Sequence, residues 1–205
     1  MADMRESLPL FPLGIVLLPT EIVPLYIFED RYKLMIGECV ERETEFGIVW
    51  LSDDGLKDIG CTARVAEVLE RMPDGRMNIL AQGGRPFRLA RKIEELPYPA
   101  GDVEMLDDTD EGDEGLAAEA REAYADLVET VTDNRPGIDE LDGLTAYGMA
   151  ATIELGAAPK QALLEERSED ARLKTVGDLF ATALQRIESA DEAQERAKSN
   201  GKVRF

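Results

Sequence analysis

The chain of 205 residues carries 43 acidic and 23 basic residues, a formal net charge of −20, and 44% of its residues are hydrophobic. This length suffices for one large domain or two small ones with their own cores, and a charge of this sign disfavours nucleic acid as a partner, because phosphates bind to lysine and arginine. The sequence contains no histidine, which excludes Ser-His-Asp and Cys-His nucleophiles as well as His-ligated metals.

The segment from Ser7 to Tyr32 combines dense branched aliphatic residues with four prolines, at positions 9, 12, 19 and 24. Each proline removes an amide donor and clashes with the preceding helical turn, so the segment is not a membrane helix. It predicts two or three short buried strands with proline-set turns, followed by a helix over about residues 29–42. The pattern does not fix whether the X-Pro bonds are cis or trans. Since no export signal is recognisable, we expect a cytoplasmic protein without membrane association.

The next part of the chain reads as a series of strands. We expect them at 45–51, 60–72, 77–82, 86–93 and 102–106, with turns at Asp53–Gly55 and Pro73–Gly75. About seven strands in total, with one inserted helix, predict a small curled sheet or pseudo-barrel, because that number must bury its edges.

The carboxy-terminal part is predicted to be helical. Residues 107–115 hold six acids and two glycines and predict a solvated linker. Two helices are expected over about 116–131 and 139–155, followed by a short helical turn that begins at Pro159. Ser168 is expected to cap a last, long helix, and the charged tail of the chain is expected to fray from Asp191. The predicted domains are therefore 1–106, rich in strands, the linker at 107–115, and a helical subdomain at 116–205.

Several segments carry a resemblance to a known family. They are LPLFPL and VLLP near the start, PLYIFEDRY at 24–32, PDGR at 73–76, GRPFRL at 84–89, LPYPAGDVEML at 96–106 and AAPKQALLE at 157–165. In this order they resemble the amino-terminal substrate-binding domain of the Lon ATP-dependent proteases, and especially short stand-alone bacterial proteins built from that domain. The resemblance implies an α+β fold in which a PUA-like β pseudo-barrel with an inserted helix precedes a helical bundle.

The same resemblance implies a function. In Lon proteases this domain helps to recognise substrates and to assemble the ring, so we expect a non-catalytic module that binds proteins or peptides, acting as an adaptor in protein quality control. Its partners would be unfolded or exposed peptide segments, together with a protease or another protein. The peptide would bind by strand addition to an exposed sheet edge, or in a groove between the subdomains. The family's catalytic Ser and Lys lie in a separate domain that we do not expect here.

Two groups of residues are candidate binding sites. Glu29, Arg31 and Tyr32 follow a predicted strand and open a helix, where they serve either as a cap with an ion pair or as the rim of a ligand groove. Arg85 and Arg88, with the neighbouring residues 91 and 92, form a basic cluster. This cluster either binds a carboxylate, an acidic peptide or RNA, or pairs with nearby acids such as those at 94 and 95.

Catalytic and metal sites are not indicated by the sequence. The five serines lie in no recognisable nucleophile setting, no phosphate-binding loop is present, and Cys39 and Cys61 are expected to be reduced core residues. We therefore expect no enzyme, no cofactor and no metal. Two alternatives stay open: an RNA-binding accessory protein that uses the basic face at 85–92, and an enzyme with a carboxylate site. The oligomeric state is also open.

Overall fold

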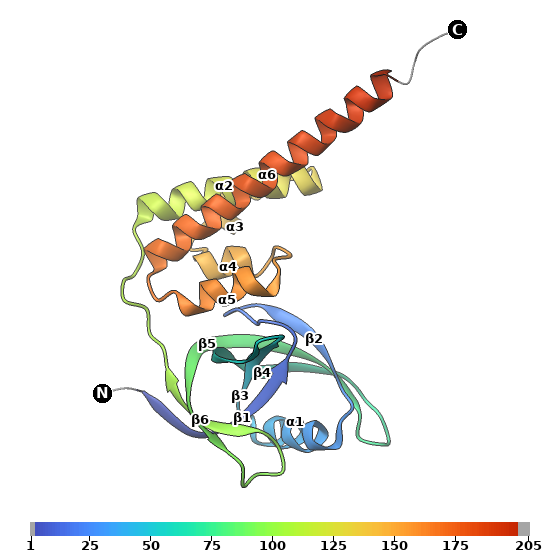
Figure 1. Cartoon of the computed structure of the whole chain (residues 1–205), viewed down its shortest axis with the longest axis vertical. Helices are drawn as coiled ribbons and strands as arrows, with labels where there is room; N and C mark the ends of the chain where they lie inside the picture. Colours follow the sequence, from blue (N-terminus) through green and yellow to red (C-terminus); the bar gives the residue numbers. More distant parts are fainter. Residues whose placement is uncertain (1–2, 201–205) are drawn as a thin grey trace.

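A computed structural model of the chain describes the backbone of residues 3–200 and, within that range, all side chains except those of 191–192 and 194–200. The fold is α+β, as predicted (Figure 1). The strands are β1 (Met4–Leu13), β2 (Ile22–Ile27), β3 (Phe46–Ser52), β4 (Gly55–Arg71), β5 (Met77–Ile93) and β6 (Ala100–Met105). The helices are α1 (Asp30–Arg42), α2 (Glu114–Thr132), α3 (Ile138–Leu141), α4 (Ala146–Ala150), α5 (Ala157–Glu165) and α6 (Glu169–Asn200).

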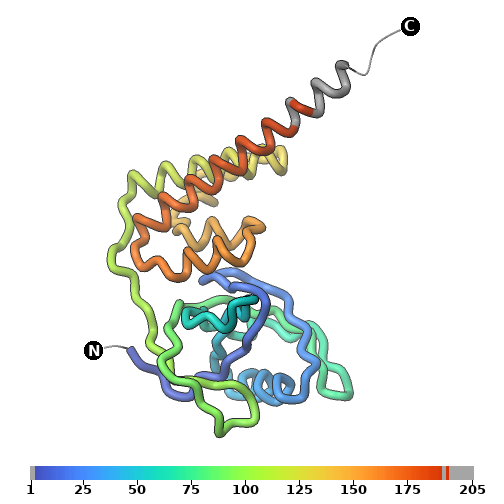
Figure 2. Tube along the Cα trace, in the orientation of Figure 1, coloured from blue at the N-terminus to red at the C-terminus, as the bar shows by residue number. Residues whose placement is uncertain are grey.

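The strands close into a pseudo-barrel. Strand β1 pairs in parallel with β3 and antiparallel with β6, while antiparallel pairs join β3 to β4, β4 to β5, and β5 to β6. Strand β2 is added to the first half of β5. The helices α2 to α6 gather at one end of the barrel and α1 lies at the other, as the chain trace also shows (Figures 1 and 2). This closure leaves few strand edges open to solvent.

The described chain contains six strands, not about seven, because β5 is continuous where two strands were predicted. A turn was expected at Gly83 and Gly84, between the predicted strands 77–82 and 86–93, but both glycines lie inside β5. A Cβ atom at Gly83 would come within 2.0 Å of the Leu18 carbonyl oxygen, and one at Gly84 within 2.4 Å of the Thr62 hydroxyl. These glycines therefore allow backbone segments to approach each other closely, and they do not form a turn.

The prolines of the opening segment are also placed differently from the prediction. Pro9 and Pro12 lie inside β1, and Pro24 lies inside β2; of the four, only Pro19 falls in a turn. Strand β2 pairs on one side only, which is where a sheet tolerates a residue without an amide donor. Among the described residues every peptide bond is trans.

The helical part departs from the prediction at one place. Instead of one helix over 139–155, the chain forms the short helices α3 and α4. The break follows from Gly143, whose φ of 70° is left-handed, and from Thr145, whose hydroxyl accepts the Gly148 N–H at 3.1 Å and caps α4. The predicted cap at Ser168 is confirmed, because its hydroxyl accepts the Ala171 N–H at 3.2 Å. Helix α6 continues to residue 200, and the rest of the predicted frayed tail, 201–205, lies outside the described residues.

The acidic segment that joins the two parts is attached to the start of α6 and is not simply solvated. Asp108 forms an ion pair with Arg172, whose side chain is 1% exposed, and two nitrogens of Arg167 donate to the Asp107 carbonyl. Hydrogen bonds, chiefly from Ser168, lower the pKa of the Asp110 carboxyl. Residues 107–115, which we call the strap, are therefore held in place by specific contacts with the start of α6.

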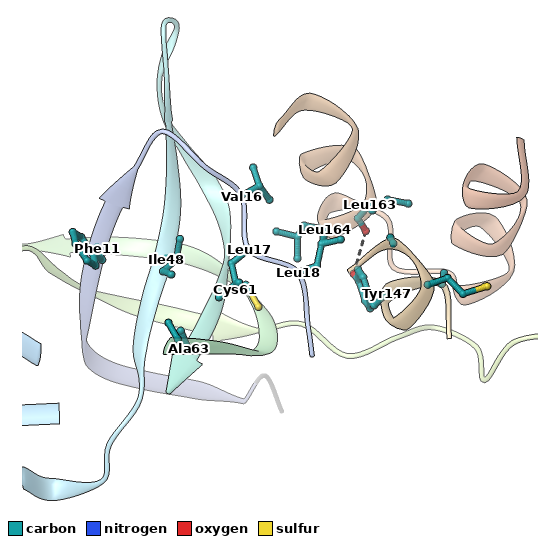
Figure 3. Packing of buried hydrophobic residues seen from close by; sticks show 14 of the residues in the cluster. Phe11, Val16, Leu17, Leu18, Ile48, Cys61, Ala63, Tyr147, Leu163 and Leu164 are labelled. Carbon is teal, nitrogen blue, oxygen red and sulfur yellow. Dashed lines mark hydrogen bonds between the residues drawn. The ribbon is translucent and has the colours of Figure 1, made fainter. Parts of the chain in front are cut away.

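One apolar core runs through the barrel and into the helices. Leu17 and Leu18, in the loop after β1, lie beside Leu163 and Leu164 of α5, all at most 1% exposed (Figure 3). A buried ion pair between Glu21 and a lysine of α5 accompanies this contact. The groove that we expected between the subdomains is therefore filled by side chains.

Candidate functional site

An open apolar groove lies beside the start of α1. It has a volume of about 570 Å³ and is built from four separate parts of the chain: the end of β1, the junction of β2 with α1, the hairpin between β3 and β4, and Pro99 just before β6. Its walls are formed by Phe11, Pro12, Leu13, Tyr26, Ile27, Phe28, Glu29, Arg31, Tyr32, Leu51, Leu56 and Pro99. Most of these side chains are apolar, so the groove is suited to apolar parts of a ligand.

A second hollow of about 410 Å³ adjoins the first one. The loop 94–99 and the end of β5 form its outer wall. The two hollows share four lining residues, which are Pro12, Arg31, Leu56 and Pro99. Together they form one continuous surface, which we call the apolar groove.

Large apolar side chains in the groove face solvent. The exposed fractions are 45% for Tyr26, 58% for Phe28 and 52% for Leu51. The rings of Tyr26 and Phe28 stack with centroids 5.8 Å apart, and Arg76 donates to the Tyr26 hydroxyl at 2.9 Å. Exposed apolar residues that cluster in one hollow typically mark a binding surface, whereas single ones are ordinary.

The structure brings together three of the predicted site residues, Glu29, Arg31 and Tyr32. Arg31 Nε donates to one carboxylate oxygen of Glu29 at 3.0 Å, and Nη2 lies 2.8 Å from the same oxygen in the ion pair. The guanidinium carbon lies 4.5 Å from the centre of the Tyr32 ring. Tyr32 is buried against Phe11, with ring centroids 4.3 Å apart, and burial raises the pKa of its hydroxyl despite the opposing effect of Arg31. The predicted ion pair is therefore present, and all three residues line the apolar groove.

Arg85 and Arg88 lie on β5, apart from the groove. Arg85 pairs with Asp3 at 3.0 Å and Asp107 at 2.6 Å, and Arg88 approaches Glu104 to 3.5 Å. Burial alone would lower the pKa of Arg85, but hydrogen bonds to its two carboxylates raise it.

The partners of the basic cluster are not the acids at 94 and 95 that the sequence suggested. They are acids from the amino-terminal segment, β6 and the strap, including Asp102, which holds Arg91 at 2.7 Å. The RNA-binding alternative requires this face to be unpaired, and three of its four cations are paired.

The carboxyl groups whose pKa values are shifted do not have the signature of a catalytic pair. Asp74, Asp102 and Asp110 have shifted pKa values, and each value is lowered, chiefly by a hydrogen bond that the carboxylate accepts. Two carboxylates that share a site would instead raise the pKa of one of them. Among the described residues, no three metal-ligating side chains gather in one place.

The sheet edges that remain open are poor templates for another strand. Pro24 interrupts the donors of β2, and β4 carries bulges between residues 65 and 67 and between 68 and 70, in the part that extends past β3. Prolines and bulges on edge strands hinder the addition of another strand. Of the two predicted binding modes, strand addition is therefore disfavoured, and the groove between the subdomains is filled.

Sequence reasoning missed most of the groove. Tyr26 and Phe28 stand two residues apart, a spacing that places side chains on one face of a strand, but Leu51, Leu56 and the 94–99 loop come from distant segments. Only the spacing of Tyr26 and Phe28 was a usable signal.

The protein is a β pseudo-barrel capped by helices, with an open apolar groove beside α1. The family model that describes the ATP-dependent protease La (LON) substrate-binding domain matches residues 7–182. The chain belongs to this family, which confirms the resemblance. Among the described residues, no helix is long and apolar enough to cross a membrane.

Known relatives agree with this assignment. The chain is 31% identical to a Lon protease of Parabacteroides distasonis over 51% of its own length, and 27% identical to one of Paraburkholderia phytofirmans over 94%. It spans only 14% and 26% of the length of these two proteases.

Two solved structures share the fold. A Lon N-terminal domain protein from Xanthomonas campestris is 26% identical, with a TM-score of 0.64 over 84% of this chain and 97% of that one. The N-terminal domain of the Mycobacterium avium complex Lon protease is 22% identical, with a TM-score of 0.65 over 86% and 98% of the two chains, and this likeness concerns the fold alone.

Proposed function

We propose that this protein binds exposed, extended segments of other proteins in the apolar groove and performs no chemistry of its own. The observation that carries the proposal is the exposure of Tyr26, Phe28 and Leu51 in one continuous hollow. Membership of a substrate-binding domain family supports a polypeptide as the ligand. Such a module would act as an adaptor in protein quality control, delivering bound segments to a protease.

The groove is a better candidate than the other surfaces. The free strand edges are interrupted by Pro24 and by bulges, and the basic cluster at Arg85 and Arg88 is paired with acids. We place the protein in the cytoplasm, where the buried thiols of Cys39 and Cys61 would stay reduced.

The proposal is tested by fluorescence anisotropy with an end-capped, labelled peptide that is extended and rich in Leu and Phe. We expect saturable binding with a Kd on the order of tens of micromolar. Leu51→Asp should weaken binding by at least about tenfold, because burying a leucine side chain is worth about 1.5–3 kcal/mol. Ile138→Asp is the matched control, since Ile138 is 86% exposed on α3, outside the groove.

The proposal fails if the wild-type protein shows no saturable binding, or if both variants weaken binding equally. For the RNA alternative, the discriminating measurement is a pull-down from native lysate divided into nuclease-treated and untreated halves. Capture of protein partners that disappears after nuclease treatment would contradict a peptide-binding adaptor.

A further inference from the structure

Arg31 holds a special position in the apolar groove. It is one of the four residues that line both hollows, and the other three, Pro12, Leu56 and Pro99, are apolar. A ligand that fills both hollows must therefore pass this guanidinium. Whatever group the ligand carries at that point lies beside a cation in otherwise apolar surroundings.

The guanidinium of Arg31 is held in place but not saturated. One oxygen of Glu29 accepts from Nε and forms the ion pair with Nη2, and the ring of Tyr32 lies under the guanidinium at 4.5 Å. A guanidinium has more N–H donors than this one oxygen uses, and no other described side chain accepts from Arg31. Its side chain is half exposed, so the remaining donors are accessible to a ligand.

The charges of the groove differ from those of the whole chain. The chain has a net charge of −20, whereas the two hollows are lined by two cations, Arg31 and Lys92, and two carboxylates, Glu29 and Glu94. Glu29 is already bound to Arg31. An acidic group is therefore repelled over most of the protein and finds an accessible donor at Arg31, where its hydrogen bonds are charge-assisted.

The ligand's backbone sets the spacing of its side chains. In an extended chain, residues i, i+2 and i+4 point to the same side, at about 6.6–6.8 Å per two residues. One apolar side chain in each hollow and one group at Arg31 between them would be carried by alternate residues of such a chain.

Resting on the proposed function, we propose that the groove is selective for an extended segment of the pattern apolar, any residue, acidic, any residue, apolar. The acidic side chain binds Arg31, and the two apolar side chains occupy the hollows on either side. Arg31 is thus the residue that determines specificity, and Glu29 and Tyr32 position it.

The test uses three labelled peptides with acetylated and amidated ends, which removes the terminal carboxylate. The peptides are identical except for a central Glu, Gln or Lys, flanked at two residues' distance by Phe and Leu. Each is titrated by anisotropy against the wild-type protein, Arg31→Met and the control Lys174→Met, since Lys174 is exposed on α6, outside the groove. Methionine keeps an unbranched apolar stem over Tyr32 and removes the charge.

We expect the Glu peptide to bind the wild-type protein about five- to tenfold more tightly than the Gln peptide, and the Lys peptide to bind most weakly. The Glu preference should weaken as salt is raised. In Arg31→Met the Glu and Gln peptides should bind within about twofold of each other. Lys174→Met should keep the preference.

Equal binding of the Glu and Gln peptides to the wild-type protein would overturn the inference and leave the proposed function standing, and so would a preference that survives Arg31→Met. If none of the three peptides binds the wild-type protein, the proposed function fails and the inference fails with it.

Discussion

Two apolar surfaces of the barrel differ in what covers them. The loop after β1, with Leu17 and Leu18, is packed against α5 and belongs to a continuous core. The groove around Leu51 and Leu56 is open, with exposed aromatic side chains on its wall. Both surfaces draw on the same proline-rich opening segment. Hydrophobicity alone therefore does not distinguish residues that stabilise the fold from residues that are available to a ligand.

The largest effect should come from making the same change on the two surfaces. Leu18→Ala should lower the free energy of unfolding by about 2–5 kcal/mol, because it opens a cavity in a filled core. Leu51→Ala should lower it by less than about 1 kcal/mol, since the Leu51 side chain is already half exposed. Urea unfolding followed by the fluorescence of the single tryptophan, Trp50, measures both. Equal losses would contradict the distinction between a covered and an open surface.

The second-largest effect on stability is expected from the strap that joins the barrel to the helices. Arg172 is 1% exposed, binds Asp108 and Glu169, and lies 4.2 Å from the centre of the Tyr147 ring. Arg172→Met should cost about 3 kcal/mol, because it leaves a buried carboxylate without its partner. The control is Arg135→Met, since this arginine also binds carboxylates but is far more exposed than Arg172, and the expected loss is much smaller. If the control costs as much as Arg172→Met, burial of the strap is not the cause.

A third change tests the close packing inside β5. Gly84→Ala should cost about 1–3 kcal/mol, because its Cβ would overlap the hydroxyl of the buried Thr62. At Gly14 a Cβ meets nothing within 4 Å, so Gly14→Ala should be close to neutral in the same unfolding measurement. A neutral Gly84→Ala would mean that the barrel relaxes at this point.

The sequence correctly predicted those turns and helix starts that depend only on neighbouring residues. Pro73–Gly75 makes the predicted hairpin turn, with Gly75 at a φ of 85°, and Asp30 opens the predicted helix. The predictions failed where contacts with segments far away in the sequence determine the local structure. Gly83 and Gly84 look like a turn until Leu18 and Thr62, which are far away in sequence, approach them.

The candidate site shows the same division. Arg31 and Tyr32 were found because they are neighbours in one short segment, but Leu51 and Leu56 reach the groove only through the pairing of β3 with β4. The partners of Arg85 were missed for the same reason, since they lie 82 and 22 residues away in sequence. The spacing of residues along the sequence does not predict contacts between residues that are so far apart in the chain.

The smallest expected effect concerns the outer surface of the barrel, away from both apolar surfaces. Asp102 binds Arg91 and accepts the N–H of Ser7, whose φ of 55° is left-handed, and these bonds, chiefly the one from Arg91, lower the pKa of the Asp102 carboxyl. A lowered pKa in the folded state stabilises the protein above the ordinary value of about 3.9, and this contribution is lost as the pH falls through the folded value. Asp102→Asn should therefore be slightly less stable than wild type at pH 7, and the difference should disappear in urea unfolding as the pH is lowered from about 5 to 2. A difference that stays constant over this range would show that the Asp102 carboxylate acts through its shape and hydrogen bonds, and not through its charge.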